Sequence, residues 1–191
     1  MEQLKSRIAT DGRVLPGNIL KVSSFLNHQI DIDLLDAMGE EFARLFSDQK
    51  ITKIVTIESS GIAVACSAAR AFHVPVVFCK KNRSSNVPED VYSSVIHSYT
   101  HGTDNTVIVS KEFISKDDSI LIIDDFLANG AALEGLVSML RQAGATVVGA
   151  GIAIEKGFQD GGKRLRKAGL RIESLAIIES MSPETGVVFL N

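Results

Sequence analysis

Apolar and polar positions follow a helical period and a strand period in turn along the chain. Residues 31–46 place apolar side chains at helical spacing with acidic residues on the opposite side, which predicts an amphipathic helix. Its apolar positions are Leu34, Leu35, Met38, Phe42, Leu45 and Phe46. A run rich in β-branched residues at 53–58 predicts a strand, and the alanine-rich residues 61–72 predict a buried helix. These segments form one helix–strand–helix unit.

The same alternation continues through the rest of the chain. Further strands are predicted at 74–80, 119–124, 146–155 and 171–178, with a helix at 130–143. Residues 91–100 and 105–113 predict two more strands, joined around His101-Gly102-Thr103 and paired antiparallel. Because helical segments separate most of the strands, we expect an α/β fold with a mostly parallel sheet flanked by helices on both faces.

The length of 191 residues is typical of one domain, so residues 1–191 are interpreted as a single domain. Residues 1–35 precede the first helix–strand unit and are interpreted as an appendage to the sheet domain. Residues 80–90 are polar, contain a proline and show no periodicity, which predicts a flexible loop.

Composition and charge narrow the class of protein. A net charge of −3 argues against a general nucleic-acid binder. The N-terminal residues carry charges throughout and show no apolar segment typical of a signal peptide, and the longest apolar runs fall short of a membrane span. Cys66 and Cys79 each lie in an apolar segment and are interpreted as reduced, buried thiols. We expect a soluble cytoplasmic protein with neither a nucleic-acid nor a membrane partner.

Two adjacent acids, Asp124 and Asp125, end the predicted strand at 119–124, and the small residues 128–132 then open a helix. In an open α/β sheet, ligands bind beyond the carboxyl ends of the strands. Small residues let a ligand approach the backbone, and N–H groups at a helix N-terminus suit a phosphate. Carboxylates repel phosphate, so the acids are expected to face sugar hydroxyls of the same ligand.

Each half of this pattern also has a simpler interpretation. An Asp pair alone can be a solvated strand end, and Asn129-Gly130 alone is a hairpin-turn signal. The residues that follow keep helical spacing, which disfavours the hairpin.

Two other segments resemble phosphate-binding motifs. Residues 157–164 nearly match a P-loop, but Arg164 stands where Ser or Thr would hold the metal, and residues 149–154 have Gly-x-Gly without a third glycine. Both are interpreted as coincidences. The basic cluster of Lys163, Arg164, Arg166 and Lys167 is interpreted as a solvated helix face and not as an RNA-binding patch.

Residues 120–133, ILIIDDFLANGAAL, closely resemble the phosphoribosyl-pyrophosphate (PRPP) motif of type I phosphoribosyltransferases. Asn129-Gly130 replaces the family's Thr-Gly, a mild departure because Asn keeps a hydrogen-bonding side chain. Residues 56–65 resemble the family's pyrophosphate loop, and 81–91 lie where the family has a mobile lid. Residues 15–35 and 152–158 resemble those of bacterial xanthine phosphoribosyltransferases, so the resemblance covers nearly the whole chain.

The resemblance implies transfer of the 5-phosphoribosyl group from PRPP to xanthine, giving xanthosine 5′-monophosphate and pyrophosphate. Asp124 and Asp125 would orient the ribose. The 5′-phosphate would be held by Ala128, Asn129, Gly130, Ala131 and Ala132. The pyrophosphate would meet Ser59, Ser60 and Gly61, helped by Lys80 or Lys81. Mg²⁺ would be bound mainly through PRPP, and the family usually forms homodimers.

For the base, the resemblance implies that residues 1–35 partly form a hood over xanthine. Lys156 would donate to the 6-oxo group, Asn27 would pair with the 2-oxo group and a ring N–H, and Leu20 would supply an apolar face or a backbone contact. From spacing alone, a helix or turn cap is the better explanation of Asn27, and the resemblance reverses that order.

Two alternative functions follow from the same fold. One is a PRPP-sensing transcriptional regulator without catalysis, although residues 1–35 are too short for a winged helix and are not basic. The other is a phosphoribosyltransferase for another base, above all hypoxanthine and guanine.

Overall fold

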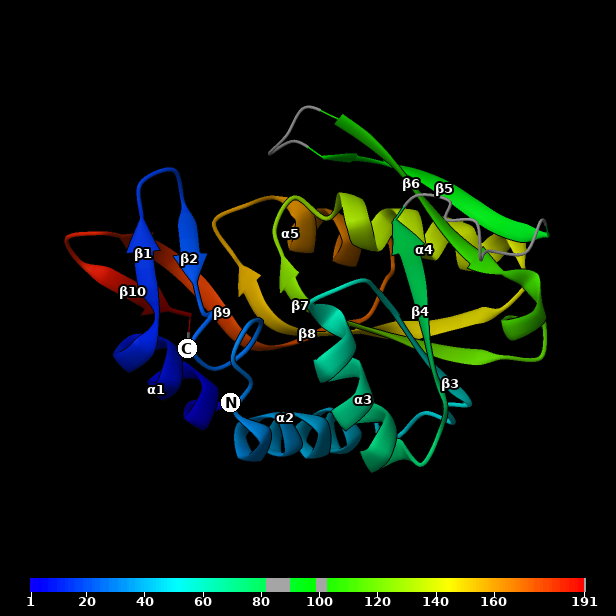
Figure 1. Ribbon diagram of the computed structural model, residues 1–191, viewed down its shortest axis with the longest axis horizontal. Helices are drawn as coiled ribbons and strands as arrows, with labels where there is room; N and C mark the ends of the chain where they lie inside the picture. Colours follow the sequence, from blue (N-terminus) through cyan, green and yellow to red (C-terminus); the bar gives the residue numbers. More distant parts are fainter. Residues whose placement is uncertain (82–89, 99–102, 191) are drawn as a thin grey trace.

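A computed structural model describes residues 1–81, 90–98 and 103–190, and its centre is an eight-stranded sheet in the order β10-β9-β8-β7-β3-β4-β6-β5 (Figure 1). The strands are β3 (Lys53–Ile57), β4 (Val76–Lys81), β5 (Val91–Ser98), β6 (Thr103–Ser110), β7 (Ser119–Leu127), β8 (Thr146–Lys156), β9 (Ile172–Ser182) and β10 (Gly186–Phe189). The five from β9 to β4 run parallel, and the strands at both edges pair antiparallel. The expected α/β fold with a mostly parallel sheet is confirmed.

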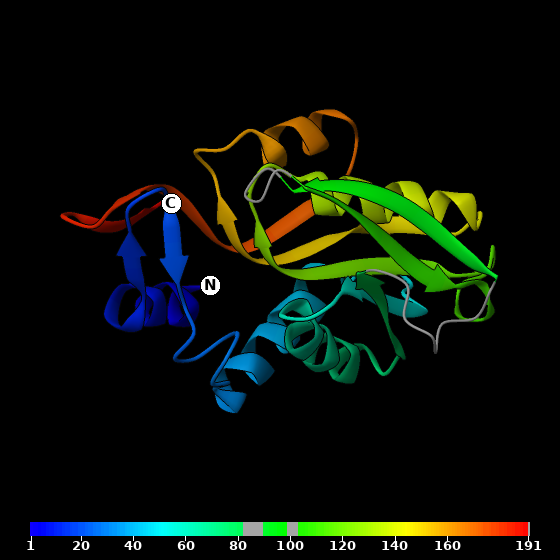
Figure 2. The same ribbon diagram turned by 45° about the horizontal axis from the view of Figure 1, so that its top comes forward.

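Helices cover both faces of this sheet (Figure 2). On one face lie α2 (Ile32–Leu45) and α3 (Gly61–Phe72), and on the other lie α4 (Ala131–Gln142) and α5 (Gly161–Lys167). The side chain of Asp31 caps α2 by accepting the N–H of Leu34, and the predicted apolar stripe of α2 is buried except for Leu45, which is partly buried. The central strand β7 is apolar on both faces because it is covered on both, as is typical of parallel sheets.

The N-terminal residues contain elements that the hydrophobic pattern did not predict. A helix, α1 (Glu2–Asp11), is followed by a hairpin of β1 (Arg13–Leu15) and β2 (Ile19–Lys21). The α-ammonium of Met1 donates to the carbonyl of Leu175 in β9, and Leu4 and Ile8 are buried. The N-terminal segment therefore packs against β9 and β10 and shares the core on the α2–α3 side of the sheet.

The predicted antiparallel pair is confirmed as β5 and β6, from Val91 opposite Ser110 to Ser98 opposite Thr103. The second strand ends at Ser110, and residues 111–113, predicted as strand, form a 3₁₀ turn capped by the Ser110 hydroxyl. The connection at 99–102 lies outside the described residues, as does most of the predicted loop and implied lid at 80–91.

The two cysteines differ from each other. Cys79 is buried in β4, and its burial raises the pKa of the thiol to about 12. The prediction of a buried thiol is wrong for Cys66, which is exposed one turn before the exposed Arg70 on α3. An alanine-rich helix offers little contrast between its faces, so the pattern did not reveal which side faces solvent. Within the ranges that the structure describes, no helix is long and apolar enough to cross a membrane.

Candidate active site

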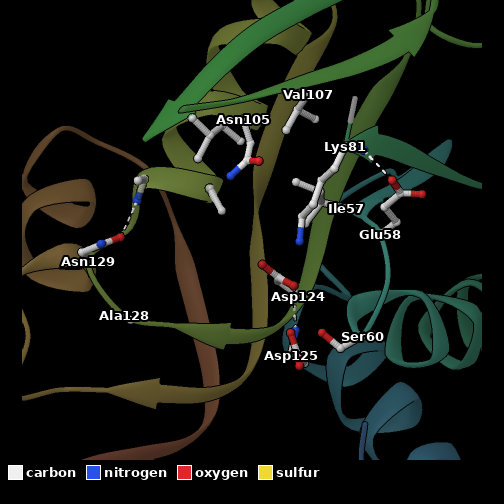
Figure 3. A pocket seen from close by; sticks show the side chains of 13 residues that line it. Ile57, Glu58, Ser60, Lys81, Asn105, Val107, Asp124, Asp125, Ala128 and Asn129 are labelled. Carbon is white, nitrogen blue, oxygen red and sulfur yellow. Dashed lines mark hydrogen bonds between the residues drawn. The ribbon is translucent and has the colours of Figure 1, made fainter. Parts of the chain in front are cut away.

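A cavity of about 280 Å³ opens at the carboxyl ends of β3, β4 and β7 (Figure 3). The pairing of β3 with β7 ends at Val55 opposite Ile122, so the two strands part beyond that point. Both α3, after β3, and α4, after β7, begin at this edge of the sheet. The cavity is lined by Ile57, Glu58, Ser60, Lys81, Ile96, Asn105, Val107, Asp124, Asp125, Ala128, Asn129, Ala131 and Ala132.

Most of the residues implied for PRPP line this one cavity. They are Ser60, Lys81, Asp124, Asp125, Ala128, Asn129, Ala131 and Ala132. Ser59, Gly61 and Gly130 belong to the same two loops but are not lining residues. Of the two candidate lysines, Lys81 lines the cavity and its ammonium group points toward Asp124, whereas Lys80 is not a lining residue (Figure 3).

The two acids lie inside β7 and not at its end, because the strand continues to Leu127. Asp124 and Asp125 are each only 7% exposed, so neither is a solvated strand end. The N–H of Asp125 donates to Oδ1 of Asp124 at 2.9 Å. Burial, together with the charge of Asp125, raises the pKa of Asp124 well above its usual range. This pair favours a ligand that donates hydrogen bonds or develops positive charge.

The small-residue loop shapes the N-terminus of α4 for an anion. Gly130 takes φ +84°, a left-handed conformation that favours glycine. The side-chain oxygen of Asn129 accepts the N–H of Ala131 at 3.0 Å, which fixes the turn. The remaining N–H groups of the first turn and the dipole of this 12-residue helix suit a phosphate.

The first turn of α5 packs directly against this loop. A Cβ atom on Gly161 would lie 2.3 Å from the carbonyl oxygen of Ala128 and 2.6 Å from the nitrogen of Gly130. Arg164 donates to the carbonyl of Asn129 at 3.2 Å and to both carboxylate oxygens of Glu134 at 2.9 Å. Gly161 and Arg164 therefore pack α5 against residues 128–130.

An ion pair between the buried Glu155 and the partly exposed Arg166 joins α5 to β8. Arg166 donates to both carboxylate oxygens of Glu155 at 2.7 Å, and the Ser174 hydroxyl donates to the same carboxylate. Glu155 is only 4% exposed, yet these hydrogen bonds keep the pKa of its carboxyl below the usual range. The interpretation of the basic cluster as a solvated face holds for Lys163, Arg164 and Lys167, which are exposed. Arg166 is only partly exposed and is paired with the buried Glu155.

The residues implied for the base lie outside this cavity, toward the N-terminal hairpin. Lys156, the last residue of β8, donates to the carbonyl of Asn18 at 2.9 Å and lies 5.9 Å from the ring centroid of Phe126. Burial lowers the pKa of the Lys156 ammonium. The side chain of Leu20 is buried in the core, which leaves its backbone for ligand contact, whereas Asn27 is exposed in a bend after β2.

Sequence reasoning missed the residues that close the cavity on its other sides. The carboxylate of Glu58 accepts the backbone N–H of Lys81 at 2.6 Å and so ties the end of β3 to the end of β4. The β5–β6 hairpin contributes Ile96, Asn105 and Val107. Glu58 directly precedes the predicted Ser59, so its place at the site could have been inferred from the sequence. Nothing in the sequence of the β5–β6 hairpin indicates that the hairpin lies over a site.

Comparison with known proteins identifies the family to which the chain belongs. Residues 23–174 match the model of the phosphoribosyl transferase domain. The chain is 55% identical over 188 residues to a xanthine phosphoribosyltransferase of Lachnoclostridium phytofermentans, covering 98% of this chain and 97% of that protein. It is 53% identical over 191 residues to a xanthine phosphoribosyltransferase of Clostridium novyi, covering all of both chains. Among solved structures, adenine phosphoribosyltransferase from Rhodothermus marinus matches with a TM-score of 0.76 and 26% identity, covering 93% of this chain and 97% of that one.

Proposed function

Because the chain belongs to the phosphoribosyl transferase family, we propose that it transfers the 5-phosphoribosyl group of PRPP to xanthine, releasing pyrophosphate. The observation that carries the chemistry is that the N-terminal ends of α3 and α4 border the same cavity, with the buried acid pair between them. The full-length relatives named xanthine phosphoribosyltransferases carry the choice of base.

The spacing of the cavity suits PRPP, which bears an anion at each end of a sugar. The 5′-phosphate would lie on residues 128–132 at the start of α4. The pyrophosphate would lie at the start of α3, on residues 59–61, with the Lys81 ammonium beside it. The ribose between them would donate its hydroxyls to Asp124 and Asp125.

The reaction needs positioning and electrostatics more than a covalent nucleophile. Positive charge develops on the ribose as pyrophosphate leaves, in the manner of an oxocarbenium ion. The carboxylates of Asp124 and Asp125 would stabilise that charge, and the helix dipole of α3 with Lys81 would stabilise the departing anion. The β5–β6 hairpin would limit the access of water to the reacting carbon.

Magnesium fits this site as a partner of the substrate. Among the described residues, no group of three His, Cys, Asp or Glu side chains could hold a metal ion. The Asp124–Asp125 pair supplies hard oxygen ligands, and Mg²⁺ commonly combines one or two carboxylates with substrate phosphates and water. When bound through PRPP, Mg²⁺ would neutralise charge on the pyrophosphate oxygens.

For the base, the proposal places xanthine between the N-terminal hairpin and the end of β8. Lys156 would donate to the 6-oxo group, and it offers no acceptor to a 6-amino group, so adenine is rejected. The amide of Asn27 would pair with the 2-oxo group and a ring N–H, and the backbone of Leu20 would border the ring. The contact from Lys156 to Asn18 supports this arrangement because it joins the hairpin to β8.

The proposal includes a homodimer in the cytoplasm. The dimer follows from the resemblance to the family, and sedimentation velocity tests it. The free thiols of Cys66 and Cys79 are typical of a reducing compartment.

The test is incubation of the purified protein with PRPP, Mg²⁺ and one purine at a time. Xanthosine 5′-monophosphate is expected from xanthine. If no base gives a nucleotide product, the proposed enzymatic activity is contradicted and a PRPP-binding regulator is favoured.

A further inference from the structure

The hydroxyl of Thr56, near the end of β3, has no hydrogen-bond partner among the described residues although Thr56 is 0% exposed. Buried polar groups nearly always have a partner, because leaving one unpaired costs free energy. The preceding residue on the same face, Ile54, packs in the apolar core. Packing alone would therefore favour Val at position 56, and the hydroxyl calls for an explanation.

The hydroxyl lies beside the acid pair. A Cβ atom on Gly61 would be 2.4 Å from Oγ1 of Thr56 and 2.8 Å from Oδ1 of Asp124. Both oxygens therefore border the same point, just beyond the last paired residues of β3 and β7. The glycine at 61 keeps the space between them open.

We propose that Thr56 is a positioning residue whose hydroxyl donates a hydrogen bond to Oδ1 of Asp124 when PRPP occupies the cavity. Oδ1 already accepts the N–H of Asp125, so a second donor on this oxygen would fix the plane of the carboxylate and leave Oδ2 for the ribose. Burial raises the pKa of Asp124, and a hydroxyl that donates to its ionised carboxylate forms a charge-assisted hydrogen bond that opposes this rise. This inference rests on the proposed function, because it assigns Asp124 to the ribose.

Four variants at this position separate the hydroxyl from the packing of the side chain. Thr and Val have the same shape and differ only in the hydroxyl group. Ser and Ala make the same comparison with a smaller side chain. Thr56→Val should therefore keep or raise the melting temperature, because a methyl group suits the apolar surroundings. It should lower kcat/KM for PRPP by roughly tenfold or more, the value of a hydrogen bond to a charged group.

If Thr56→Val fails to fold, the Ser and Ala variants test the role of the hydroxyl instead. Thr56→Ser should retain activity within about threefold of the wild type, and Thr56→Ala should lose about as much as Thr56→Val. Mg²⁺–PRPP binding, measured as a thermal shift without any base, should weaken in the Val and Ala variants only.

Equal kcat/KM and equal PRPP binding in the Thr56→Val and wild-type proteins would overturn the role of Thr56. An equal loss in Thr56→Ser and Thr56→Ala would overturn it too, because that loss would follow the methyl group. If the wild type binds PRPP but forms no nucleotide, the proposed function fails, and the thermal shifts still decide whether the hydroxyl matters.

Discussion

Replacing Gly161 with Ala tests whether α5 holds residues 128–132, the proposed 5′-phosphate loop, in place. The added Cβ atom would lie 2.3 Å from the carbonyl oxygen of Ala128, 2.5 Å from the carbonyl carbon of Asn129 and 2.6 Å from the nitrogen of Gly130. All three are backbone atoms, which cannot rotate away as the end of a side chain can. The helix and the loop must therefore separate.

The size of that separation follows from the contacts. Ordinary carbon contacts begin near 3.4 Å, so the two segments must move apart by about 1 Å. Overpacking of this kind costs about 1–3 kcal/mol of stability, which lowers the melting temperature by roughly 2–12 °C in a chain of this length. A displacement of about 1 Å at a binding loop can reduce catalysis by about 100-fold.

We expect Gly161→Ala to fold, to raise KM for PRPP and to lower kcat/KM for PRPP by roughly 10- to 100-fold, with a smaller change in KM for the base. The assay is initial-rate kinetics with each substrate varied, beside circular dichroism and thermal melting. Lys163→Ala on the same helix is the control, because that side chain is exposed. Wild-type kcat/KM for PRPP in a folded Gly161→Ala protein would refute the supporting role of α5.

Three further changes probe the acids, the ion pair and the base. Asp125→Asn should keep the fold and lower kcat, since a neutral amide stabilises a cationic ribose less, and an unchanged kcat in the folded variant would exclude that role. Arg166→Met should lower the free energy of unfolding in urea by roughly 1–3 kcal/mol, because it leaves the buried Glu155 carboxylate without its charged partner, and adding Glu155→Leu should restore most of it. The pKa of Glu155 is depressed in the folded state, so its ion pair stabilises the fold above the unfolded pKa of about 4.3, and this stabilisation is lost as pH falls through the folded pKa. Equal urea midpoints of the wild type and the Arg166→Met variant at pH 7 would contradict this account. Asn27→Ala should narrow the preference for xanthine over hypoxanthine by roughly 1–3 kcal/mol in kcat/KM, and an unaltered ratio would remove Asn27 from the base site.

The parts of the molecule that could be predicted are those encoded by local periodicity. The apolar run before Asp124 and the helical spacing after Gly130 lie within one short stretch, so strand, loop and helix followed from it together. The first helix, α1, was missed because it is mostly polar and buries only Leu4 and Ile8.

The supports of the site could not be predicted, because each joins residues distant in the sequence. Arg164 reaches back 30 residues to Glu134, and Lys81 donates its N–H to Glu58 from another strand. The sequence around a charged residue in a basic cluster does not indicate such a partner, because the tertiary structure brings the two residues together. Thr56 likewise reads as an ordinary strand residue until Asp124 is seen beside it.

The measurement that tests the central claim most directly is competition of xanthine, hypoxanthine and guanine for one limiting pool of PRPP with Mg²⁺, with the nucleotide products separated and quantified. We predict that xanthosine 5′-monophosphate predominates, because the 2-oxo group gains a partner that hypoxanthine cannot use. A product mixture dominated by inosine or guanosine 5′-monophosphate would contradict the assignment of xanthine while leaving the phosphoribosyl transfer intact.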